Sequence, residues 1–358
     1  MITYKNFDEK NYLDANPDVK KAIERGDFVD GLEHYKKFGI KEMRPLKNET
    51  SRFGKVFCKL NKYGRGLEIG PSHRPIAPKK DGFNVHILDH LSAQDLKEKY
   101  KDHGVNLDNI EDVDYIWHGE PFTELIGERD YYDWIIASHV IEHVPDMISF
   151  LNQCAEILKK DGKLSLVIPD KRYCFDYFSP LSSTGDFLDA YSEKRTRPTS
   201  GQIFDHIVNA SKRFNNIAWA DDDLGGADEL SSNFSEAESA YIRSMNSNEY
   251  IDIHCSRFTP LSFQLIVSDL FRLRLIAFDV IQFYETEGCE FYITLAKTDF
   301  NSQGANNKDR LSELKKIRAE INDKKNYMRV NEKLKRVFMK VLNQLKCFQK
   351  IYINGGVK

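Results

Sequence analysis

The chain has 358 residues, which is enough for one large domain with appendages or for two domains. Its 41% hydrophobic and 30% charged residues are typical of a soluble globular protein, and no apolar run reaches the roughly 18 residues that span a bilayer. The net charge of −3 conceals an asymmetry: residues 301–358 hold fifteen Lys/Arg against five Asp/Glu, so the rest of the chain is acidic. An acidic body without an aromatic and basic surface argues against nucleic-acid binding.

Residues 1–48 are predicted to form a small helical module. Apolar residues recur at roughly helical spacing, and Asn16 before Pro17 suits an N-cap followed by proline at the first helical position. One interpretation is a packing extension of the main domain. Segments 12–19 and 31–39 also resemble a short helical motif appended to bacterial cell-surface-glycan enzymes, which implies a docking role and names no chemistry.

Residues 49–300 are predicted to form one domain in which strand-like apolar runs alternate with helical stretches, as in βαβ units. A helix is predicted over 147–158, and residues 160–163 are expected to turn from it into the next strand. This pattern predicts an α/β, Rossmann-like fold around a parallel sheet. The expected strands are 67–69, 85–88, 114–117, 134–138 and 164–168.

Residues 176–250 interrupt the alternation. They are rich in Ser, Asp and Asn, and we expect an irregular insertion of the kind that forms a lid or a disordered loop. Regularity returns with a helix that Thr259 caps and that runs from Pro260 to about Phe271. Two closing strands are predicted over 275–283 and 290–296.

Residues 301–358 are predicted to form a basic amphipathic helix after a polar linker. Apolar residues at three-to-four spacing with lysines between them suit a coiled coil, a membrane-surface helix or a docking helix. Two interpretations carry equal weight: the helix docks to a protein or to an anionic inner membrane leaflet, or it is an ordinary solvated helix.

The corners at the ends of the first strands have the chemistry of a nucleoside pocket. Glycine at position 70 lets backbone amides approach a ligand, whereas the acidic Glu68 suits an ammonium group better than a pyrophosphate. Asp89 closes the second strand, where a carboxylate can accept hydrogen bonds from both ribose hydroxyls. His118 and Gly119, after the third strand, are expected along the adenine edge. The phosphate-loop motif is missing, and Pro71 and Ser72 stand where a dinucleotide fold has further glycines.

These corners, with 138–146 (SHVIEHVPD) and 158–164 (LKKDGKL), resemble the class I S-adenosylmethionine-dependent methyltransferases over about residues 52–297. The resemblance implies a seven-stranded sheet with a reversed final strand and S-adenosylmethionine as cofactor. Segments 168–176, 258–263 and 290–295 are similar to a bacterial branch linked to polysaccharide and lipopolysaccharide assembly. When the methyltransferase resemblance is applied residue by residue to this sequence, the predicted cofactor-binding residues are Glu68, Gly70, Pro71, Asp89, His118, Gly119, Ser138 and His139.

Methyl transfer to a sugar hydroxyl requires a base, because a neutral alcohol is a poor nucleophile. Our catalytic candidates are His254, which we favour, then His143, His139 and His206; Asp170 is a further candidate base. The alternative for His143 is that it caps or packs the following helix together with Glu142. The alternative for His254 is a core histidine held by a carbonyl group.

The segment after the fifth strand, Asp170, Lys171, Arg172 and Tyr173, is the predicted substrate-binding set. Its basic groups would meet an anionic acceptor, such as a phosphorylated or uronic glycan; alternatively, they only pair with nearby carboxylates. We assign no metal ligands, because the acidic run 221–223 is most simply a solvated loop.

The predicted function is methyl transfer from S-adenosylmethionine to a hydroxyl of a bacterial surface-glycan sugar, which would be presented free or on a nucleotide or lipid carrier. The alternatives are a catalytically silent scaffold in a glycan-assembly complex and a nicotinamide-dependent sugar-modifying enzyme. The six cysteines lie far apart, which fits a reducing cytoplasm. We therefore expect a cytoplasmic protein, with the basic tail as a candidate anchor to the inner membrane face.

Overall fold

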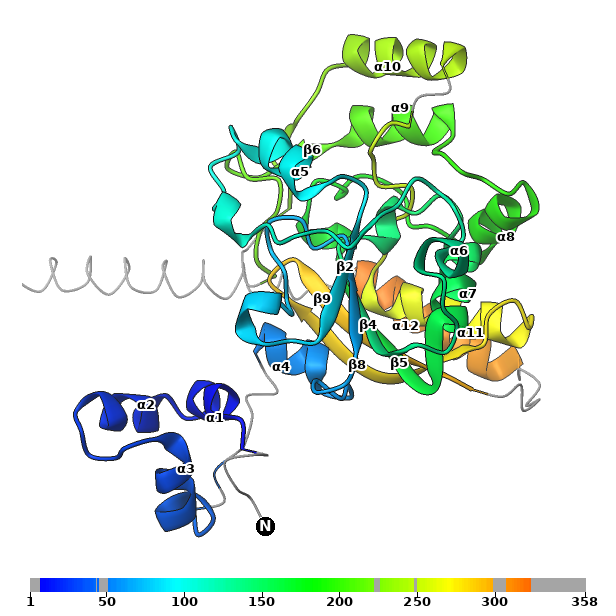
Figure 1. Ribbon diagram of the computed structural model, residues 1–358. Helices are drawn as coiled ribbons and strands as arrows, with labels where there is room; N and C mark the ends of the chain where they lie inside the picture. The colour runs from blue at the N-terminus through cyan, green and yellow to red at the C-terminus, as the bar shows by residue number, and fades with distance from the viewer. Residues whose placement is uncertain are drawn as a thin grey trace, which may run out of the picture.

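The computed structural model describes residues 7–42, 44, 51–221, 226–247, 250–298 and 307–322. A seven-stranded sheet forms its centre (Figure 1), with the strand order β3-β2-β1-β4-β5-β9-β8. The predicted Rossmann-like α/β fold is therefore confirmed. The strands are β1 (Gly66–Ile69), β2 (Val85–Asp89), β3 (Tyr115–Ile116), β4 (Tyr132–Ser138), β5 (Leu158–Pro169), β8 (Phe278–Glu287) and β9 (Glu290–Lys297).

Strands β1 to β5 run parallel, and β9 lies antiparallel between β5 and β8. This confirms the expected reversed final strand. The order of the strands reverses between β1 and β4, where Ile69 pairs with Ala137. In open α/β sheets, such a switch point is where ligands bind, outside the carboxyl ends of the strands. We call this side of the sheet the carboxyl edge.

The sheet is buried on both faces, as the alternation along β4 shows. Ile135 and Ala137 belong to the larger core cluster, whereas Trp134 and Ile136 belong to a second cluster on the opposite face. Gly66 is required next to this tryptophan, because a Cβ there would come within 2.1 Å of the ring. The two cores hold the strands rigidly, so their ends form a fixed platform.

Short helices cover the two faces. Helix α4 (Arg52–Phe57) contributes Val56 and Phe57 to the core that contains Trp134, and α7 (Met147–Ile157) and α11 (Pro260–Arg272) pack on the other face. The other helices of this region are α5 (Ala93–Tyr100), α6 (Phe122–Ile126) and the 3-10 turns η2 (Lys79–Asp81), η3 (Leu107–Asn109), η4 (Ile141–His143) and η5 (Lys171–Tyr173).

The boundary between α7 and β5 differs from the predicted one. The helix ends at Ile157, and β5 begins at Leu158, so residues 160–163 belong to the strand instead of a turn. The strand starts early because Leu158 pairs with Tyr132 before a register shift in β4. Lys160 and Asp161 are exposed at the beginning of the strand, whereas Gly162 is buried.

The insertion 176–250 is more regular than predicted. It holds α8 (Thr184–Ser192), α9 (Ser200–Asn209), α10 (Phe234–Asn246) and the two-stranded sheet of β6 (Ser211–Lys212) and β7 (Glu229–Leu230). Helices α9 and α10 lie together at the top of Figure 1. Each of the three helices begins with a capping box, such as Thr199 with Gln202. Those pairs are the sequence pattern that our prediction overlooked.

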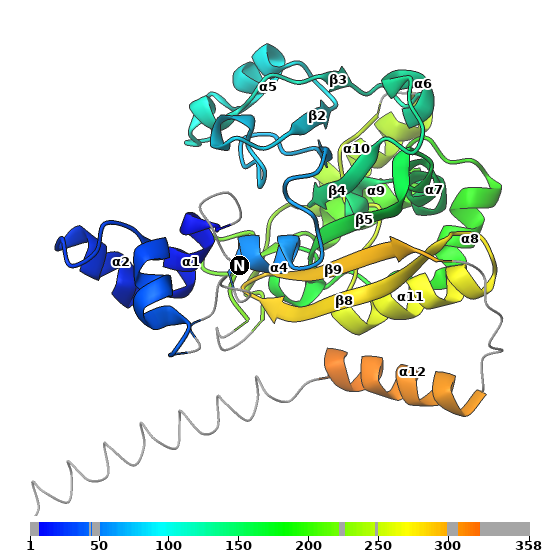
Figure 2. The same ribbon diagram turned by 60° about the horizontal axis from the view of Figure 1, so that its bottom comes forward.

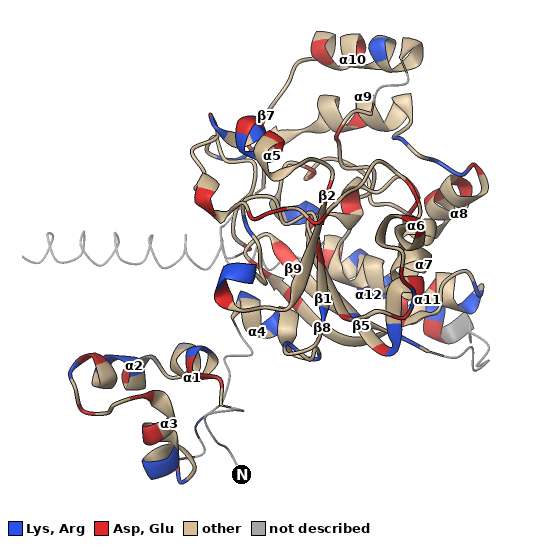
Figure 3. Cartoon of the chain, viewed as in Figure 1, with Lys and Arg blue, Asp and Glu red and all other residues tan. Residues whose placement is uncertain are grey.

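The N-terminal residues form the helical module that the spacing predicts. It consists of α1 (Glu9–Ala15), α2 (Pro17–Glu24), α3 (Gly31–His34) and the π-helical turn η1 (Tyr35–Gly39), and acidic and basic residues are interspersed over its helices (Figure 3). Its core includes a 2.8 Å hydrogen bond between the Tyr12 hydroxyl and His34 Nδ1. Ion pairs connect the module to the main domain: Asp8 with Lys62, and Lys10 with Asp81.

The described part of the tail is α12 (Asn307–Ile321), which packs against α11 (Figure 2). Arg310 Nη1 lies 2.5 Å from Asp269 Oδ1, and Ile317 is buried. This first part of the predicted docking helix is thus bound to the chain's own domain; residues 323–358 lie outside the described part. Among the described residues, no helix has the length and apolar character needed to cross a membrane.

Candidate active site

The β1 corner is organised by a buried carboxylate. Glu68 is 1% exposed, and its two oxygens accept hydrogen bonds from the backbone amides of Ile76 (2.7 Å) and Ala77 (3.0 Å). Burial raises the pKa of Glu68 to about 7, although these amide bonds act in the opposite direction. Both oxygens of Glu68 thus hold the loop that follows Gly70. The implied contact of Glu68 with the cofactor stays a prediction.

Gly70 and Pro71 form the turn at the switch point. Gly70 has a φ of +63°, and a Cβ at this position would come within 2.8 Å of Val140 Cγ2. Only glycine fits both the backbone conformation and this space. Pro71 is buried, and the backbone amide of the next residue, Ser72, donates a 3.2 Å hydrogen bond to Asp89 Oδ2.

Asp89, at the end of β2, is 2% exposed and lies beside this turn. Its Oδ1 accepts from the backbone amide of His90 and lies 2.7 Å from Nδ1 of the same residue. The backbone amide of Trp117 bonds to the Asp89 carbonyl, which brings the His118–Gly119 turn next to Asp89. The predicted ribose and adenine residues thus lie together, and the sequence analysis missed His90.

A second network lies at the end of β4 and the start of β9. Arg52 donates to Ser138 Oγ (2.8 Å) and to Glu290 Oε1 (2.7 Å), and Glu290 Oε2 lies 2.8 Å from His139 Nε2. Burial alone would raise the pKa of Glu290, but the bonds from His139, Arg52 and Tyr292 lower it to about 2. Neither Arg52 nor Glu290 was predicted as a site residue: Arg52 belongs to no motif, and Glu290 was noted only as the first residue of the family-like segment 290–295.

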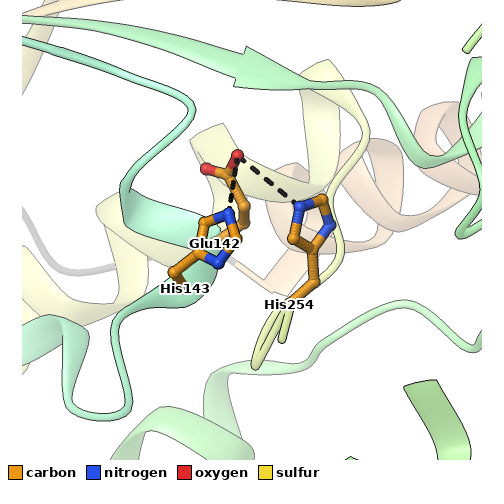
Figure 4. A group of neighbouring side chains, drawn as sticks. All are labelled: Glu142, His143 and His254. Carbon is orange, nitrogen blue, oxygen red and sulfur yellow. Dashed lines mark ion pairs between the residues drawn. The ribbon is translucent and has the colours of Figure 1, made fainter. Parts of the chain in front are cut away.

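Three of the four catalytic histidine candidates surround one buried carboxylate, Glu142. Its Oε1 lies 3.6 Å from His139 Nδ1, 4.0 Å from His143 Nε2 and 3.9 Å from His254 Nε2. Figure 4 shows Glu142, His143 and His254 with these imidazoles directed at the carboxylate. His143 belongs to η4, whereas His254 comes from the segment between the insertion and α11. His254 is far from Glu142 and His143 in the sequence, so no local pattern predicts that the three side chains meet.

Each outer imidazole nitrogen has a carboxylate partner. His143 Nδ1 lies 2.8 Å from Asp252 Oδ1, and His254 Nδ1 lies 2.5 Å from Asp176 Oδ2. The hydrogen bond from His143 lowers the pKa of Asp252 to about 2. Burial would lower the pKa of His143, but the bond to Asp252 and the charge of Glu142 raise it. Contrary to our alternative interpretation, His143 does not cap α7, since the N-cap is Asp146.

His206 lies in α9 and reaches this cluster from the insertion. Its Nδ1 accepts a 3.3 Å hydrogen bond from the backbone amide of His254. The imidazole of His254 itself is held by the Asp176 carboxylate instead of by a carbonyl group. Burial lowers the pKa of His206 to about 4. A weakly basic nitrogen that already accepts a hydrogen bond is poorly suited to accept the acceptor's proton, which argues against His206 as the general base. Its catalytic role stays a prediction.

Most side chains of the predicted substrate-binding segment form hydrogen bonds within the chain. Asp170 is fully buried and bonds to the Arg172 guanidinium and to the Thr286 hydroxyl. Arg172 also donates to the Glu320 carbonyl in α12, and Lys171 donates to the Tyr177 carbonyl. The alternative of internal pairing therefore holds for Arg172, and Asp170 is not available as a base.

The remaining members of two predicted sets lie in different surroundings. Tyr173, the last of the substrate-binding set, is half-buried in η5, and its substrate contact stays a prediction. In the acidic run, Asp221 Oδ1 accepts a hydrogen bond from the Gly288 amide, while residues 222–223 lie outside the described part of the chain.

The model of the methyltransferase-domain family matches residues 35–268, so the chain belongs to this family. No curated protein matches the chain. Among solved structures, it is similar to an S-adenosylmethionine-dependent methyltransferase from Aquifex aeolicus (12% identity, TM-score 0.34, covering 69% of this chain and 90% of that one). Two others of this kind come from Methanosarcina mazei (14%, 0.35, 68% and 96%) and Mesorhizobium loti (9%, 0.35, 67% and 95%). The family assignment rests on the family model.

The protein is thus a class I S-adenosylmethionine-dependent methyltransferase, and the residues at the switch point fit this cofactor. Gly70 keeps the turn at the switch point free of a side chain, and Asp89 Oδ2 accepts one hydrogen bond among the described residues, from Ser72, which leaves that oxygen capacity for ribose hydroxyls. Asp89 would hold the ribose and Ser138 and His139 would lie at the methyl end. When bound, the cofactor supplies an electrophilic methyl group on a sulfonium.

Proposed function

We propose that this methyltransferase methylates a hydroxyl group of a sugar in a bacterial surface glycan. The observation that carries the proposal is the pairing of His139 with Glu290 immediately after Ser138. A hydroxyl acceptor needs a proton acceptor at the methyl end of the cofactor, and an imidazole oriented by a carboxylate is suited to this task.

His139 fits the role of base better than His254, which the sequence analysis favoured. The His139 side chain is 39% exposed, whereas that of His254 is 7% exposed and faces Glu142. A base must come within hydrogen-bond reach of the acceptor. His139 also has a φ of +54°, a conformation that is uncommon for a residue with a side chain and that recurs at functional sites.

The surrounding residues orient this base. Glu290 holds the His139 ring, and Arg52 bonds both Glu290 and Ser138, so the three side chains form one network at the end of β4. Glu290 stabilises the imidazolium that forms when His139 accepts the hydroxyl proton. The resemblance to the glycan-linked branch supports the sugar as the acceptor, and the carrier of that sugar is part of the same proposal.

The test is mass spectrometry of the surface glycan from cells with and without the protein. We expect one sugar of the glycan to lack a methyl group when the protein is absent, and reintroduction of the wild-type chain to restore it. The matched control is reintroduction of His139→Ala, which removes the proposed base and should not restore the methyl group. An unchanged glycan in a strain shown to express the protein would refute the sugar acceptor.

A further inference from the structure

Glu142 is a fully buried carboxylate for which the described part of the chain offers no hydrogen-bond partner at either oxygen. An ionised carboxylate in this situation costs several kcal/mol unless a cation or a donor compensates it. The imidazole nitrogens around it lie at 3.6 to 4.0 Å, which is beyond hydrogen-bond distance. These nitrogens are within ion-pair distance, but only a protonated imidazole would balance a charge on Glu142, whereas a bound cation would do so directly.

The outer contacts of His143 and His254 determine what faces Glu142. Their Nδ1 atoms lie against the carboxylates of Asp252 and Asp176, which orients the Nε2 atoms inward. In the neutral tautomer with hydrogen on Nδ1, both inward nitrogens present lone pairs to the lone pairs of Glu142. A carboxylate behind each histidine, with the other nitrogen facing a common centre, is the usual surrounding of a metal-bound imidazole.

The spacing of the inward atoms suits an ion. The Glu142 oxygen and the two Nε2 atoms all lie within 4.8 Å of one another. Bonds of about 2.1 Å to a tetrahedral ion place ligand atoms roughly 3.4 Å apart, so small side-chain shifts close the site. Two imidazoles and one carboxylate favour zinc or a similar transition metal over Mg²⁺, and this set leaves a fourth position open, as in catalytic zinc sites.

We propose that Glu142, His143 and His254 bind a divalent transition-metal ion, with zinc as the best-fitting one. The His143 side chain, 31% exposed, is the accessible side of this site, and His139 lies next to it. A role in the reaction rests on the proposed function: the acceptor hydroxyl would occupy the open position, where the ion lowers its pKa, and its proton would pass to His139. Binding of the ion is independent of that function.

The experiment is calorimetric titration of Zn²⁺ into tag-free, full-length protein stripped with a chelator, since a histidine tag would itself bind zinc. We expect one ion per chain and a rise in the melting temperature with Zn²⁺. Glu142→Gln should lower the affinity by more than the ~10–100-fold typical of outer-shell changes. Asp252→Asn, which removes only an outer carboxylate, should lower it within that range.

The matched control is His103→Ala, which removes an exposed histidine and should leave the zinc affinity unchanged. In the metal-free state, Glu142→Gln should be at least as stable as the wild type, because it replaces a buried carboxylate that has no hydrogen-bond partner among the described residues. If it fails to fold, His254→Gln and His143→Gln take its place with the same expectation. Equal zinc affinity in wild type and folded site variants, or no binding by wild type, would overturn the site.

A chelator distinguishes this site from the proposed function. Zinc binding with the expected variants supports the site even if the glycan keeps its methyl groups, which refutes only the sugar acceptor. If the glycan loses its methyl group in cells without the protein but the purified protein binds no zinc, the metal site is refuted and the proposed sugar acceptor is still supported. Unchanged methyl transfer by chelated protein, with zinc still bound by the untreated chain, would overturn the ion's role in the reaction.

Discussion

On the β1–β2 side of the carboxyl edge, the buried carboxylates of Glu68 and Asp89 accept hydrogen bonds from backbone amides, and one imidazole, that of His90, lies beside Asp89. On the β4–β9 side, Glu290, Asp252 and Asp176 each face an imidazole. Backbone amides are fixed by the fold, so the first side is organised before any ligand arrives. The imidazoles of the second side can exchange protons or bind an ion. We therefore expect the first side to act mainly in binding the cofactor and the second mainly in the chemistry.

The two sides also differ in what they leave unpaired. Both oxygens of Glu68 are bonded, but those of Glu142, equally buried, have no partner among the described residues. A buried carboxylate that accepts hydrogen bonds from a loop stabilises that loop. A buried carboxylate without such bonds is favourable only when a ligand supplies the missing interactions. Variants on the β1–β2 side should therefore change mainly the affinity for the cofactor, and variants on the β4–β9 side mainly the turnover.

The largest effect should come from His139→Ala. Removal of a general base costs about 10²–10⁴-fold in rate, because the acceptor hydroxyl keeps its proton. We expect turnover to fall by this factor while the affinity for S-adenosylmethionine, measured by calorimetry, changes little. The matched variant is His118→Ala, at the predicted adenine edge, which should affect affinity before turnover. A His139→Ala enzyme with normal turnover would remove the distinction between the two sides.

The arrangement of the sheet was predictable because each strand is a local pattern. The runs that precede Gly70, Asp89 and His139 are short, apolar and regularly spaced, so β1, β2 and β4 could be placed before the structure was known. The boundary at Leu158 was not predictable, because pairing with Tyr132 across the sheet determines where β5 begins. The helices of the insertion were missed although their capping boxes are local.

The site was only partly predictable, for a physical reason. Each corner residue follows its own strand, so the parallel fold alone brings Gly70, Asp89 and Ser138 together. The histidine cluster depends instead on contacts between distant segments, such as Asp176 with His254, which no local pattern encodes. The same holds for Arg52 and Glu290, far apart in the chain. Arg172 was misassigned because its partner, Asp170, is a neighbour whose burial the sequence did not reveal.

An intermediate effect is expected for Asp89→Asn. The variant removes the negative charge that the predicted ribose contact uses, and hydrogen bonds to charged groups contribute about 1.5–3 kcal/mol. The affinity for S-adenosylmethionine should therefore fall roughly 10- to 100-fold. Turnover at saturating cofactor should stay close to that of the wild type. Asp95→Asn, an exposed aspartate of α5, is the control for a lost charge nearby. Loss of turnover without loss of affinity would contradict the ribose assignment.

The smallest effect should appear in the pH dependence of stability of Glu290→Gln. The pKa of Glu290 is lowered from 4.5 to about 2, so its ionised form stabilises the fold above about pH 4.5, and this contribution is lost as the pH falls toward 2. At neutral pH, loss of the charged hydrogen bonds should cost roughly 1–3 kcal/mol. Thermal unfolding from pH 7 down to pH 3 should show the difference between variant and wild type shrinking on the acid side.

The control for this measurement is Glu285→Gln, which removes an exposed carboxylate from the same hairpin. Surface substitutions of this kind change stability by at most about 0.5 kcal/mol, so its difference from the wild type should be small across the range. A Glu290→Gln difference that stays constant down to pH 3 would mean that Arg52 and His139 do not stabilise the ionised carboxylate. The β4–β9 side would then lack the charge coupling that separates it from the β1–β2 side.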